Sequence, residues 1–506
     1  MNHSQCVLGI DIGTSSCKCL VVTREGTILG AARVPYGIRS PHIGWGEEDP
    51  ETVFFATLES VHKAISIAGI RPGQITALGF SGSLHSILAV DKKGNPLTPA
   101  LIWADTRSQK YIPYVLEQRN ARAVYERTGC PVHPLYPAYK ILWLRDCVPG
   151  LIGQASKFLS LKEYVLSRLL KRYVVDRSVA SGTALFNIHT LDWDPDMLRL
   201  AGITPENLSN HVAPTTVFEG IDPAYADAMG ISPDVPIVIG AGDGMLSHLG
   251  AGCIEPGQAS CMIGTSGALR IFSPTPRLDT HQRTWCYLFT DSIWAVGGAI
   301  NDAGLAYQWF RELLYPEAKG EDQIEKEAKK AGPGAEGLLF FPFLTGERSP
   351  GWNPDARGLL FGLSFHHNRH HIFRAVLEGV AFAMRTILDA LQEIGGKITE
   401  IRASGGLLNT PLWSQILADV FGTEILVPAI TDTTAVGAAF LAMYALGWLS
   451  RIQDIREYVK IAEARSPNPE NQRIYEDLYQ LYRALYQDVR SHFSTISALQ
   501  REFVTK

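Results

Sequence analysis

Residues 6–22 read CVLGIDIGTSSCKCLVV, and residues 258–272 read QASCMIGTSGALRIF. In both stretches an apolar, strand-like run leads into Ile-Gly-Thr-Ser, at 12–15 and again at 263–266, and a second apolar run follows. The two copies lie 251 residues apart (264 minus 13), which is close to half of the 506-residue chain. Self-similarity at a long offset is typical of a repeated structural unit. The sequence therefore predicts a duplicated domain.

Strand-like and helix-like patterns alternate through the first half of the chain. An amphipathic pattern over 50–68 predicts a helix, and 75–80 is apolar and strand-like. Such alternation is typical of layered α/β domains. The Gly- and Pro-rich segment 250–257 suits a connection. We therefore predict an N-terminal domain over 1–252 and a C-terminal domain over 253–506, with a ligand cleft between them.

The composition narrows the class of protein. Apolar residues make up 46% of the chain and charged residues 19%, which is typical of a folded globular protein. The net charge of −5 argues against sequence-independent binding of nucleic acid, which needs a basic surface. Eight cysteines without a CxxC pair favour reduced thiols and hence a cytoplasmic protein. The longest uncharged stretch, 433–450, contains two glycines and favours a buried helix over a membrane span.

The first Gly-Thr-Ser turn is a candidate phosphate site. Gly13 allows the backbone to approach an anion closely, and Thr14 and Ser15 supply hydroxyl and N–H donors. Asp11, at the end of the preceding strand, would hold Mg²⁺, and Lys18 would add positive charge near the phosphates. A plain β-hairpin turn explains the same residues, and that alternative stays open.

The second copy of the turn offers another phosphate cradle. Gly264 and Thr265 repeat the small, hydrogen-bonding character of the first turn, without the preceding acid. Further along, Gly405, Gly406 and Asn409 follow a short strand and precede a helical pattern, which favours close approach to a nucleotide base or sugar. A simple strand–helix turn is the alternative for these three residues.

Asp243 is the candidate catalytic base. An apolar strand over 235–239 runs into Gly-Ala-Gly-Asp-Gly, and an apolar helix begins near Met245. A carboxylate at such a strand end is well placed to accept a proton from a substrate hydroxyl. A helix N-cap is the structural alternative. The dinucleotide pattern GxGxxG fails because its sixth position is Met245, and the chain contains no GxxxxGK[ST] phosphate loop.

Two polar segments after strands suit a polyhydroxylated ligand. The first, Ser-Gly-Ser-Leu-His-Ser, supplies Leu84 and His85, and the second, Trp-Ala-Asp-Thr-Arg-Ser, supplies Trp103, Asp105 and Arg107. An aromatic ring packs on a carbon chain while polar groups bind its hydroxyls, so we predict that these five residues bind a sugar. For His85, a hydrogen-bonded core histidine is an equal alternative.

A histidine-rich segment, 366–371, resembles a metal cluster because two pairs of its histidines stand four residues apart. The neighbouring Asn368 and Arg369 and the amphipathic run that follows favour the start of a surface helix instead. We expect the helix start, and metal binding stays a minor alternative.

These elements, in this order, resemble the FGGY family of carbohydrate kinases over about residues 6–485. The stretch 136–144, YPAYKILWL, is similar to the first family signature. The stretches 358–363, GLLFGL, and 371–378, HIFRAVLE, fit the second. The resemblance implies an α/β fold of two ribonuclease H-like domains, as in actin and hexokinase. It also implies an ATP-dependent carbohydrate kinase that uses Mg²⁺.

The resemblance also implies roles for individual residues. Asp243 occupies the position of the catalytic base and Asp11 that of the metal-associated carboxylate. Leu84 and His85 stand where xylulokinases have a substrate-contacting Met-His pair, and where glycerol kinases have Arg-Glu. The stretch 405–409 falls in the adenosine-binding region. The first domain would thus hold the sugar and the two acids, and the second the nucleotide. After the catalytic aspartate, xylulokinases usually have Asn and glycerol kinases Gln, whereas this chain has glycine.

Within the family, strings such as WADTRS and VIGAGDGMLSHLG are most similar to the FGGY-type gluconokinases. We therefore expect phosphorylation of D-gluconate to 6-phosphogluconate, with xylulokinase or another sugar or polyol kinase of the family as the alternative. His85, Arg107 and His248 are candidates to hold the gluconate carboxylate. An actin- or chaperone-like ATPase switch is a remote alternative, because a switch has no use for a hydroxyl-rich pocket. A homodimer contact through the helical pattern at 470–495 stays open, and no nucleic-acid or membrane partner is expected.

Overall fold

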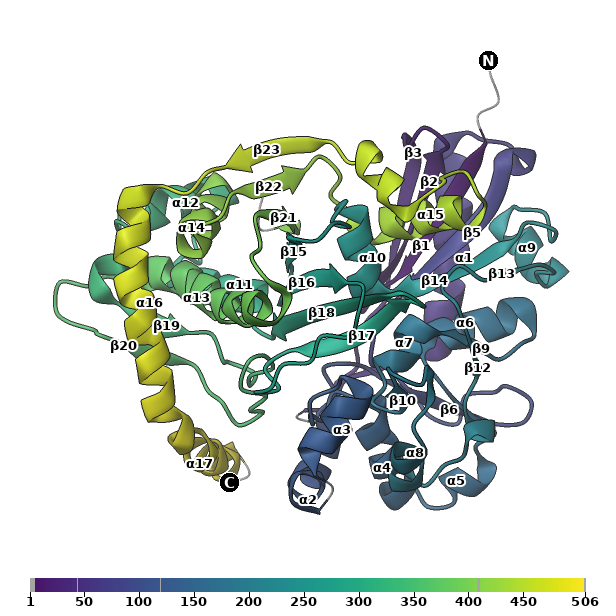
Figure 1. Cartoon of the computed structure of the whole chain (residues 1–506), viewed down its shortest axis with the longest axis horizontal. Coiled ribbons are helices and arrows are strands. Elements are labelled where there is room, and N and C mark those ends of the chain that lie inside the picture. The colour runs from purple at the N-terminus through teal and green to yellow at the C-terminus, as the bar shows by residue number, and fades with distance from the viewer. Residues whose placement is uncertain (1–4, 43, 119, 407–409, 505–506) are drawn as a thin grey trace.

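Two β-sheets, one in each half of the chain, organise the molecule (Figure 1). The computed structural model describes residues 5–42, 44–118, 120–406 and 410–504. The first sheet has the order β13-β14-β5-β1-β2-β3 and the second the order β17-β18-β16-β15-β21-β22-β23. The first sheet comprises β1 Cys6–Ile12, β2 Ser16–Thr23, β3 Ile28–Pro35, β5 Ile75–Gly82, β13 Val217–Phe218 and β14 Ile237–Gly242. The second comprises β15 Gln258–Ile263, β16 Gly267–Ser273, β17 Trp285–Thr290, β18 Ile293–Ile300, β21 Glu400–Ser404, β22 Ile425–Pro428 and β23 Ile461–Arg465.

The two sheets repeat one strand arrangement. In the first, β1 pairs antiparallel with β2 and parallel with β5. In the second, β15 pairs antiparallel with β16 and parallel with β21. The repeated Gly-Thr-Ser turns join β1 to β2 and β15 to β16. The predicted duplication of an α/β unit is therefore confirmed.

Helices cover both sheets. The helix predicted over 50–68 is confirmed as α1 Pro50–Ala68, whose N-cap is Asp49 and whose apolar side packs on β2 and β3. Two helices of the second half, α13 Arg369–Gly395 and α14 Pro411–Phe421, lie together, and α13 covers β16 and β18. The helices α16 Pro469–Val489 and α17 Phe493–Val504 run along the outer edge of the second half (Figure 1).

A lower lobe of the first half carries short elements between β5 and β14 (Figure 1). Its helices are α2 Ile112–Gln118, α3 Ala121–Thr128, α4 Pro137–Cys147, α5 Leu151–Gln154, α7 Arg177–Ser181 and α8 Pro195–Ala201, while α6 Leu161–Leu170 and α9 Pro223–Met229 pack against α1. Its strands are β6 Leu88–Val90, β7 Ala100–Leu101, β8 Lys157–Leu159, β9 Val174–Asp176, β10 Phe186–Asn187, β11 Asp192–Trp193 and β12 Asn210–Val212, while β4 Glu47–Glu48 pairs with β7. The remaining elements of the second half are α11 Gly304–Leu314, α12 Glu321–Ala328, β19 Leu339–Phe341 and β20 Leu359–Phe361.

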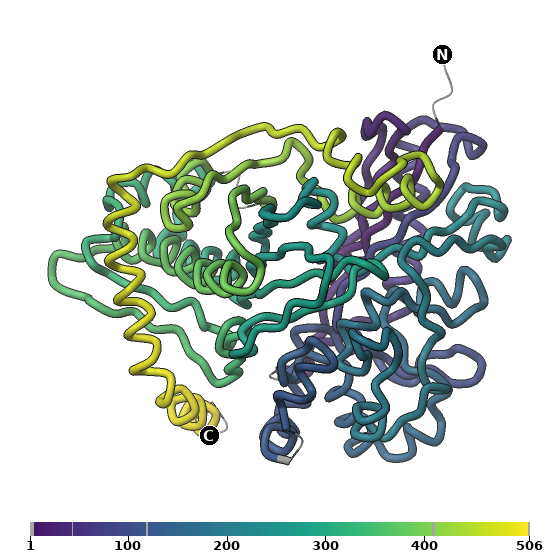
Figure 2. The backbone as a smooth tube through the Cα atoms, viewed as in Figure 1, coloured from purple at the N-terminus to yellow at the C-terminus, as the bar shows by residue number. Residues whose placement is uncertain are grey.

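The chain returns to the first half near its end, as the tube in Figure 2 shows. There α15 Thr433–Ala445 packs on β1 and β5 and against α10 Asp243–Gly250. The two helices touch backbone to backbone, because a Cβ on Gly437 would lie 1.9 Å from the carbonyl oxygen of Leu246. The expectation that the uncharged stretch forms a buried helix is thus confirmed. No helix in the described residues has the length and apolar character needed to cross a bilayer.

Candidate active site

Three loops meet at one edge of the first sheet, because the parallel strands β14, β5 and β1 end there side by side. Gly82 at the end of β5 pairs with Ile12 of β1 on one side and with Gly242 of β14 on the other. The second sheet closes the opposite side, and a cavity of about 100 Å³ remains. It is lined by Leu84, His85, Trp103, Asp243, Gly244, Met262, Ser266, Ala268, Arg270, Trp285, Tyr287, Ala299 and Arg348.

Asp243 lies in this cavity as the first residue of α10. One of its carboxylate oxygens, Oδ1, accepts a hydrogen bond from the backbone N–H of Gly244 at 2.7 Å. Burial raises the pKa of Asp243, and the nearby positive charge of Arg270 opposes that rise. The backbone N–H groups of Gly244 and Leu84 both stabilise the ionised carboxylate, and a carboxylate offers about four acceptor positions, so the group keeps acceptor capacity for a ligand hydroxyl.

Asp11 and Lys18 lie on β1 and β2, next to each other in the antiparallel register. The carboxylate of Asp11 accepts a hydrogen bond from Ser81 Oγ at 3.0 Å. Burial and the negative charge of Asp243 raise the pKa of Asp11 to about 7, and Lys18 opposes that rise. The ammonium group of Lys18 forms an ion pair with Asp432, at the start of α15. Its charge is thus shared with a carboxylate of the second half.

His85 faces the cavity from a strained backbone position, with φ +69°. Its Nδ1 lies 2.7 Å from the carbonyl oxygen of Gly182. A carbonyl oxygen only accepts, so Nδ1 carries the proton and Nε2 is left as an acceptor. Burial holds the pKa of His85 well below its usual range, and the ring is neutral. The rings of Tyr136 and Tyr287 pack edge-on against it, at 5.2 Å and 5.8 Å between centroids.

Lys140, from the first family-like signature, hydrogen-bonds the backbone of this part of the site. It is fully buried and donates hydrogen bonds from Nζ to the carbonyl oxygens of His85, at 2.8 Å, and Ile102, at 2.5 Å. One side chain therefore ties together the loops that carry His85 and Trp103. Burial lowers the pKa of Lys140 to about 7.

The second predicted sugar segment divides between the cavity and the core. Trp103 lines the cavity and donates from Nε1 to Thr14 Oγ1 at 3.0 Å. Asp105 and Arg107 lie outside the lining residues, in an ion-pair cluster with Glu47. Arg107 also stacks on the ring of Trp45, 3.7 Å from its centroid. The structure therefore brings Trp103 into contact with a phosphate-turn residue and buries the other two.

Two arginines of the second half line the cavity, and the sequence analysis did not single them out. Arg270 on β16 is 7% exposed, and its Nε and Nη1 find no hydrogen-bond partner in the described part of the chain. Arg348 donates from Nη2 to the carbonyl oxygen of Ile300 at 3.2 Å, and its Nε has no partner. Burial lowers the pKa of both, to about 10 for Arg348. A charged residue in the otherwise apolar run GALRIFS is the signal that would have found Arg270.

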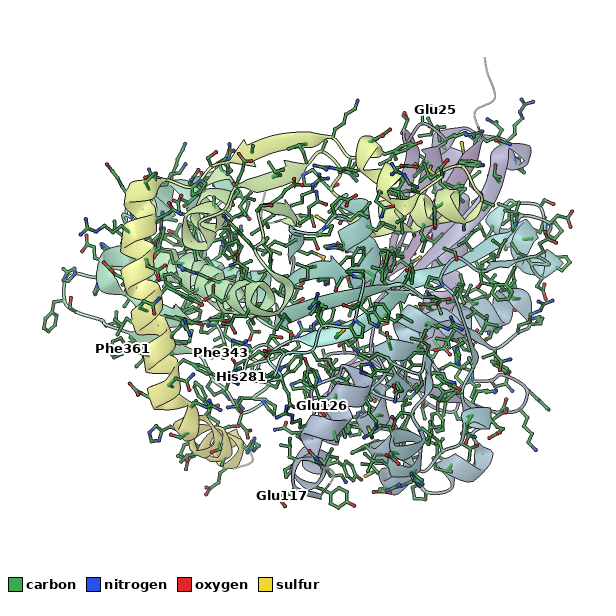
Figure 3. All side chains as sticks on the ribbon, viewed as in Figure 1. Glu25, Glu117, Glu126, His281, Phe343 and Phe361 are labelled. Atoms are coloured by element: carbon green, nitrogen blue, oxygen red, sulfur yellow. The ribbon has the colours of Figure 1, made fainter. Side chains whose placement is uncertain are left out.

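A loop around 343–350 brings Arg348 to the cavity. The carboxylate of Asp302 accepts hydrogen bonds from the N–H and the hydroxyl of Thr345, both at 2.8 Å. At the start of the loop, Phe343 lies beside α16 (Figure 3), and its ring packs against Tyr486 at 5.9 Å. The guanidinium of Arg348 then lies 5.1 Å from the centroid of the Trp103 ring. Contacts on both sides thus hold the loop that positions this cation.

The turns of the second sheet lie side by side as well. The carbonyl oxygen of Thr265 accepts hydrogen bonds from the N–H groups of Ala303, at 3.2 Å, and Leu305, at 3.1 Å. Gly405 adopts φ +115°, and a Cβ there would lie 2.0 Å from the carbonyl oxygen of Ile263. The turns at 264–266 and 405–406 are therefore adjacent at the ends of two parallel strands. Gly406 has open space around it, and Asn409 lies outside the described residues.

His248 and the histidine-rich segment lie away from the cavity lining. His248 is fully buried, with Nδ1 2.7 Å from Ser260 Oγ and its ring on Phe272. The segment 366–371 is the start of a helix, as predicted, because Asn368 caps the N-terminus of α13. Within the described ranges, no group of three His, Cys, Asp or Glu residues is arranged to hold a metal ion.

Comparison with known proteins decides the family. Residues 6–250 match the N-terminal domain of the FGGY family of carbohydrate kinases, and residues 259–446 match its C-terminal domain. The chain belongs to this family. The predicted resemblance and the actin- and hexokinase-like fold are therefore confirmed. The protein is a sugar kinase, which transfers phosphate to an alcohol group, and kinases of this family use ATP as the phosphate donor.

Full-length relatives are similar to different degrees. The gluconokinase of Bacillus subtilis (strain 168) is 36% identical over 510 residues, which cover 99% of this chain and 99% of that protein. A xylulose kinase of Staphylococcus epidermidis (strain ATCC 12228 / FDA PCI 1200) is 29% identical over 490 residues, covering 96% and 97%. The solved structure of a gluconate kinase from Lactobacillus acidophilus matches with a TM-score of 0.93 at 29% identity, covering 97% of this chain and 100% of that one.

Proposed function

We propose that this kinase transfers the γ-phosphoryl group of ATP to the C6 hydroxyl of D-gluconate. The observation that carries the proposal is the charge of the cavity, where two guanidinium groups face the same space as Asp243. A buried cation needs a compensating anion, and a polyol with a carboxylate supplies one. The 36% identity to gluconokinases over the full chain supports the same substrate, and the xylulose kinase at 29% is more distant.

Asp243 is the proposed base. Its free acceptor capacity lies at the cavity, where the C6 hydroxyl would donate its hydrogen bond. The carboxylate orients this hydroxyl toward the γ-phosphorus and takes its proton as the new P–O bond forms and ADP leaves. In a loose phosphoryl-transfer transition state, this positioning contributes more to the rate than proton removal does.

The phosphate turns are proposed to flank the triphosphate. Gly13, Thr14 and Ser15 would approach it from the first half, and Gly264 and Thr265 from the second. A divalent cation fits beside the first turn, since the buried carboxylate of Asp11 near the end of β1 supplies hard oxygen ligands there. Asp11 would hold Mg²⁺, which neutralises phosphate charge when bound. Lys18 would act on the phosphates at longer range, because its ammonium group forms an ion pair with Asp432.

The remaining lining residues are proposed to bind the sugar chain. His85 accepts a hydrogen bond from a sugar hydroxyl at Nε2, while Leu84 and Trp103 supply apolar surface for its carbon backbone. Gly405, Gly406 and Asn409 are proposed to contact the nucleoside. The proposal thus assigns the sugar and both acids to residues 1–252 and most nucleotide contacts to 253–506, and closure of the two halves would exclude water.

Coupled ADP release tests the function. The purified chain with ATP and Mg²⁺ is assayed with D-gluconate, D-xylulose, glycerol and no sugar. We expect gluconate to give a kcat/KM at least about tenfold above the other sugars, as expected for a site that pairs the substrate carboxylate. A ketose preference would overturn gluconate as the substrate and leave the kinase in place. Equal turnover without sugar would contradict sugar phosphorylation itself.

The base assignment has its own variant. Asp243→Asn keeps the size of the side chain and is expected to lower kcat by about 10²–10⁴ with little change in ATP binding. Asp234→Asn, at an exposed position, is the matched control. Near-wild-type turnover of Asp243→Asn would contradict the assignment.

A further inference from the structure

Arg270 is buried beside the cavity, where the charge of Asp243 acts on it, but it keeps unused hydrogen-bond donors. Its side chain is 7% exposed, and two of its three guanidinium nitrogens, Nε and Nη1, have no hydrogen-bond partner among the residues that the structure describes. A buried and unsatisfied cation normally costs several kcal/mol of stability. Arginines of the same protein are satisfied elsewhere, as Arg402 is by Glu400 at 2.7 Å and by the carbonyl oxygen of Ala251 at 2.9 Å. Unused donors that line a cavity indicate a ligand that accepts hydrogen bonds there.

Gly244 makes the space that the Arg270 side chain occupies. A Cβ built on Gly244 would lie 2.8 Å from Arg270 Nε and 3.1 Å from Nη2. Both distances are shorter than ordinary van der Waals contact, so any side chain at this position would displace the guanidinium group. The absence of a side chain on Gly244 thus allows the Arg270 guanidinium group to lie where it does.

The register of β16 places Arg270 at the end of the cavity farther from the phosphate turn. Ala268 and Arg270 both line the cavity, since alternate residues of a strand share one face. The turn at 264–266 directly precedes β16, so Arg270 is two residues, about 7 Å, farther from it than Ala268 is.

We infer that Arg270 binds the C1 carboxylate of the sugar acid with the donors that the protein leaves unused, while the C6 hydroxyl lies at Asp243. The inference rests on the proposed function and names the residue that selects an aldonate over a neutral sugar or polyol. Planar guanidinium binds carboxylate through two parallel hydrogen bonds, which lysine does not reproduce. Arg348, held through Nη2 by Ile300, adds a second positive charge to the same cavity.

Paired substrates separate carboxylate binding from catalysis. D-Gluconate is compared with D-glucitol, which has the same carbon skeleton and hydroxyl configuration but CH₂OH in place of the carboxylate. For Arg270→Met we expect the ratio of kcat/KM for gluconate to kcat/KM for glucitol to fall about 100-fold, as for loss of a charge-assisted pair. The effect of the lost charge on Asp243 acts on both substrates and cancels in this ratio. For Arg270→Lys we expect the ratio to fall about tenfold.

Gly244→Ala provides a second variant, one that keeps the Arg270 side chain. Alanine favours the helix α10, so stability is expected to hold or increase. The Cβ would push the guanidinium away, and the KM for gluconate is expected to rise at least about tenfold without a matching loss on glucitol. Arg402→Met is the matched control, since it removes a buried arginine of the same sheet outside the cavity lining. Its preference for gluconate over glucitol should stay at the wild-type value.

Each outcome bears on the inference. Equal losses on gluconate and glucitol in Arg270→Met would overturn it and place Arg270 in phosphoryl transfer or folding. An unchanged gluconate-to-glucitol ratio in Arg270→Met or an unchanged gluconate KM in Gly244→Ala would overturn it as well. Calorimetric binding of D-gluconate and D-gluconamide to the same variants gives the comparison without turnover. Failure of the proposed function looks different, because the wild-type enzyme itself would then phosphorylate a neutral sugar and not gluconate.

Discussion

Replacing Arg107 by Met tests whether this residue binds sugar or holds the fold. Its Nη2 lies 2.7 Å from Glu47 Oε1 and 2.7 Å from Asp105 Oδ2, and the three side chains are 4%, 12% and 0% exposed. The guanidinium also lies 3.7 Å from the centroid of the Trp45 ring. In Arg107→Met, two buried carboxylates lose their cation. Asp105 keeps the N–H of Gly46, at 2.8 Å, as a donor.

The magnitude follows from this burial. Breaking a buried ion pair from one side costs about 3–5 kcal/mol, because the remaining charge stays desolvated. The remaining N–H donor to Asp105 favours the lower end of that range, and the lost stacking on Trp45 favours the upper end. We expect the free energy of unfolding of Arg107→Met to fall by about 4 kcal/mol. The KM for sugar of the folded enzyme should change less than about threefold, because Arg107 is outside the cavity lining.

Urea unfolding followed by tryptophan fluorescence measures this loss, and Trp45 reports on the cluster itself. Arg122→Met is the matched control. Arg122 pairs with Glu126 at 2.8 Å, but the two side chains are 63% and 52% exposed, so its loss should cost less than about 0.5 kcal/mol. The reasoning is refuted if Arg107→Met unfolds at the same urea concentration as the wild-type enzyme and its KM for sugar rises more than about tenfold.

Two further predictions address the second half of the chain. Burial raises the pKa of Glu347 from 4.5 to about 7, so the unfolded chain releases this proton first and stability falls as the pH rises from 4.5 to 7. Glu347→Gln should reduce this pH-dependent loss of unfolding free energy by about 3 kcal/mol. Urea unfolding at pH 5 and pH 8 measures the loss in the variant and in the wild-type protein. An identical loss in both proteins would contradict the prediction. Gly405→Ala would bring a Cβ within 2.0 Å of the Ile263 carbonyl oxygen, and we expect the KM for ATP to rise at least about tenfold. Gly153→Ala, with open space around it, is its control, and equal ATP kinetics in the two variants would contradict the role of Gly405.

The fold was predictable because its signals are local. Strand–turn–strand patterns repeat at 6–22 and 258–272, and both produce the same strand pairing. The helix at 50–68 is indicated by the periodicity of its apolar residues and by a proline in its first turn. The position of α15 was not predictable in the same way. Its burial followed from its apolar composition, but its contact with β1 depends on a chain reversal more than 400 residues away in sequence.

The site was predictable where strand ends determine it. Asp243 and His85 follow parallel strands, whose ends meet at one edge, and both line the cavity. Arg107 also follows a strand, but its side chain pairs with Glu47 of the short strand β4 and stacks on Trp45, and the sequence pattern does not place these two residues beside it. Arg270 was missed for the opposite reason. Its motif is an apolar strand, and the face it occupies becomes functional only when the two halves meet.

The duplication explains why an arginine is tolerated at position 270. Strand pairing relates the two copies: Leu20 of β2 pairs with Gly9 of β1, and Arg270 of β16 pairs with Ser260 of β15, which lies 251 residues after Gly9, so Arg270 is the counterpart of Leu20. In the first half this face is core, because Leu20 is 2% exposed and α15 packs against β2. A guanidinium there would be buried without a partner and would destabilise the sheet. In the second half the same face opens on the cavity instead, so a charge that the first copy excludes becomes available to a substrate. One strand position thus serves packing in one copy and recognition in the other.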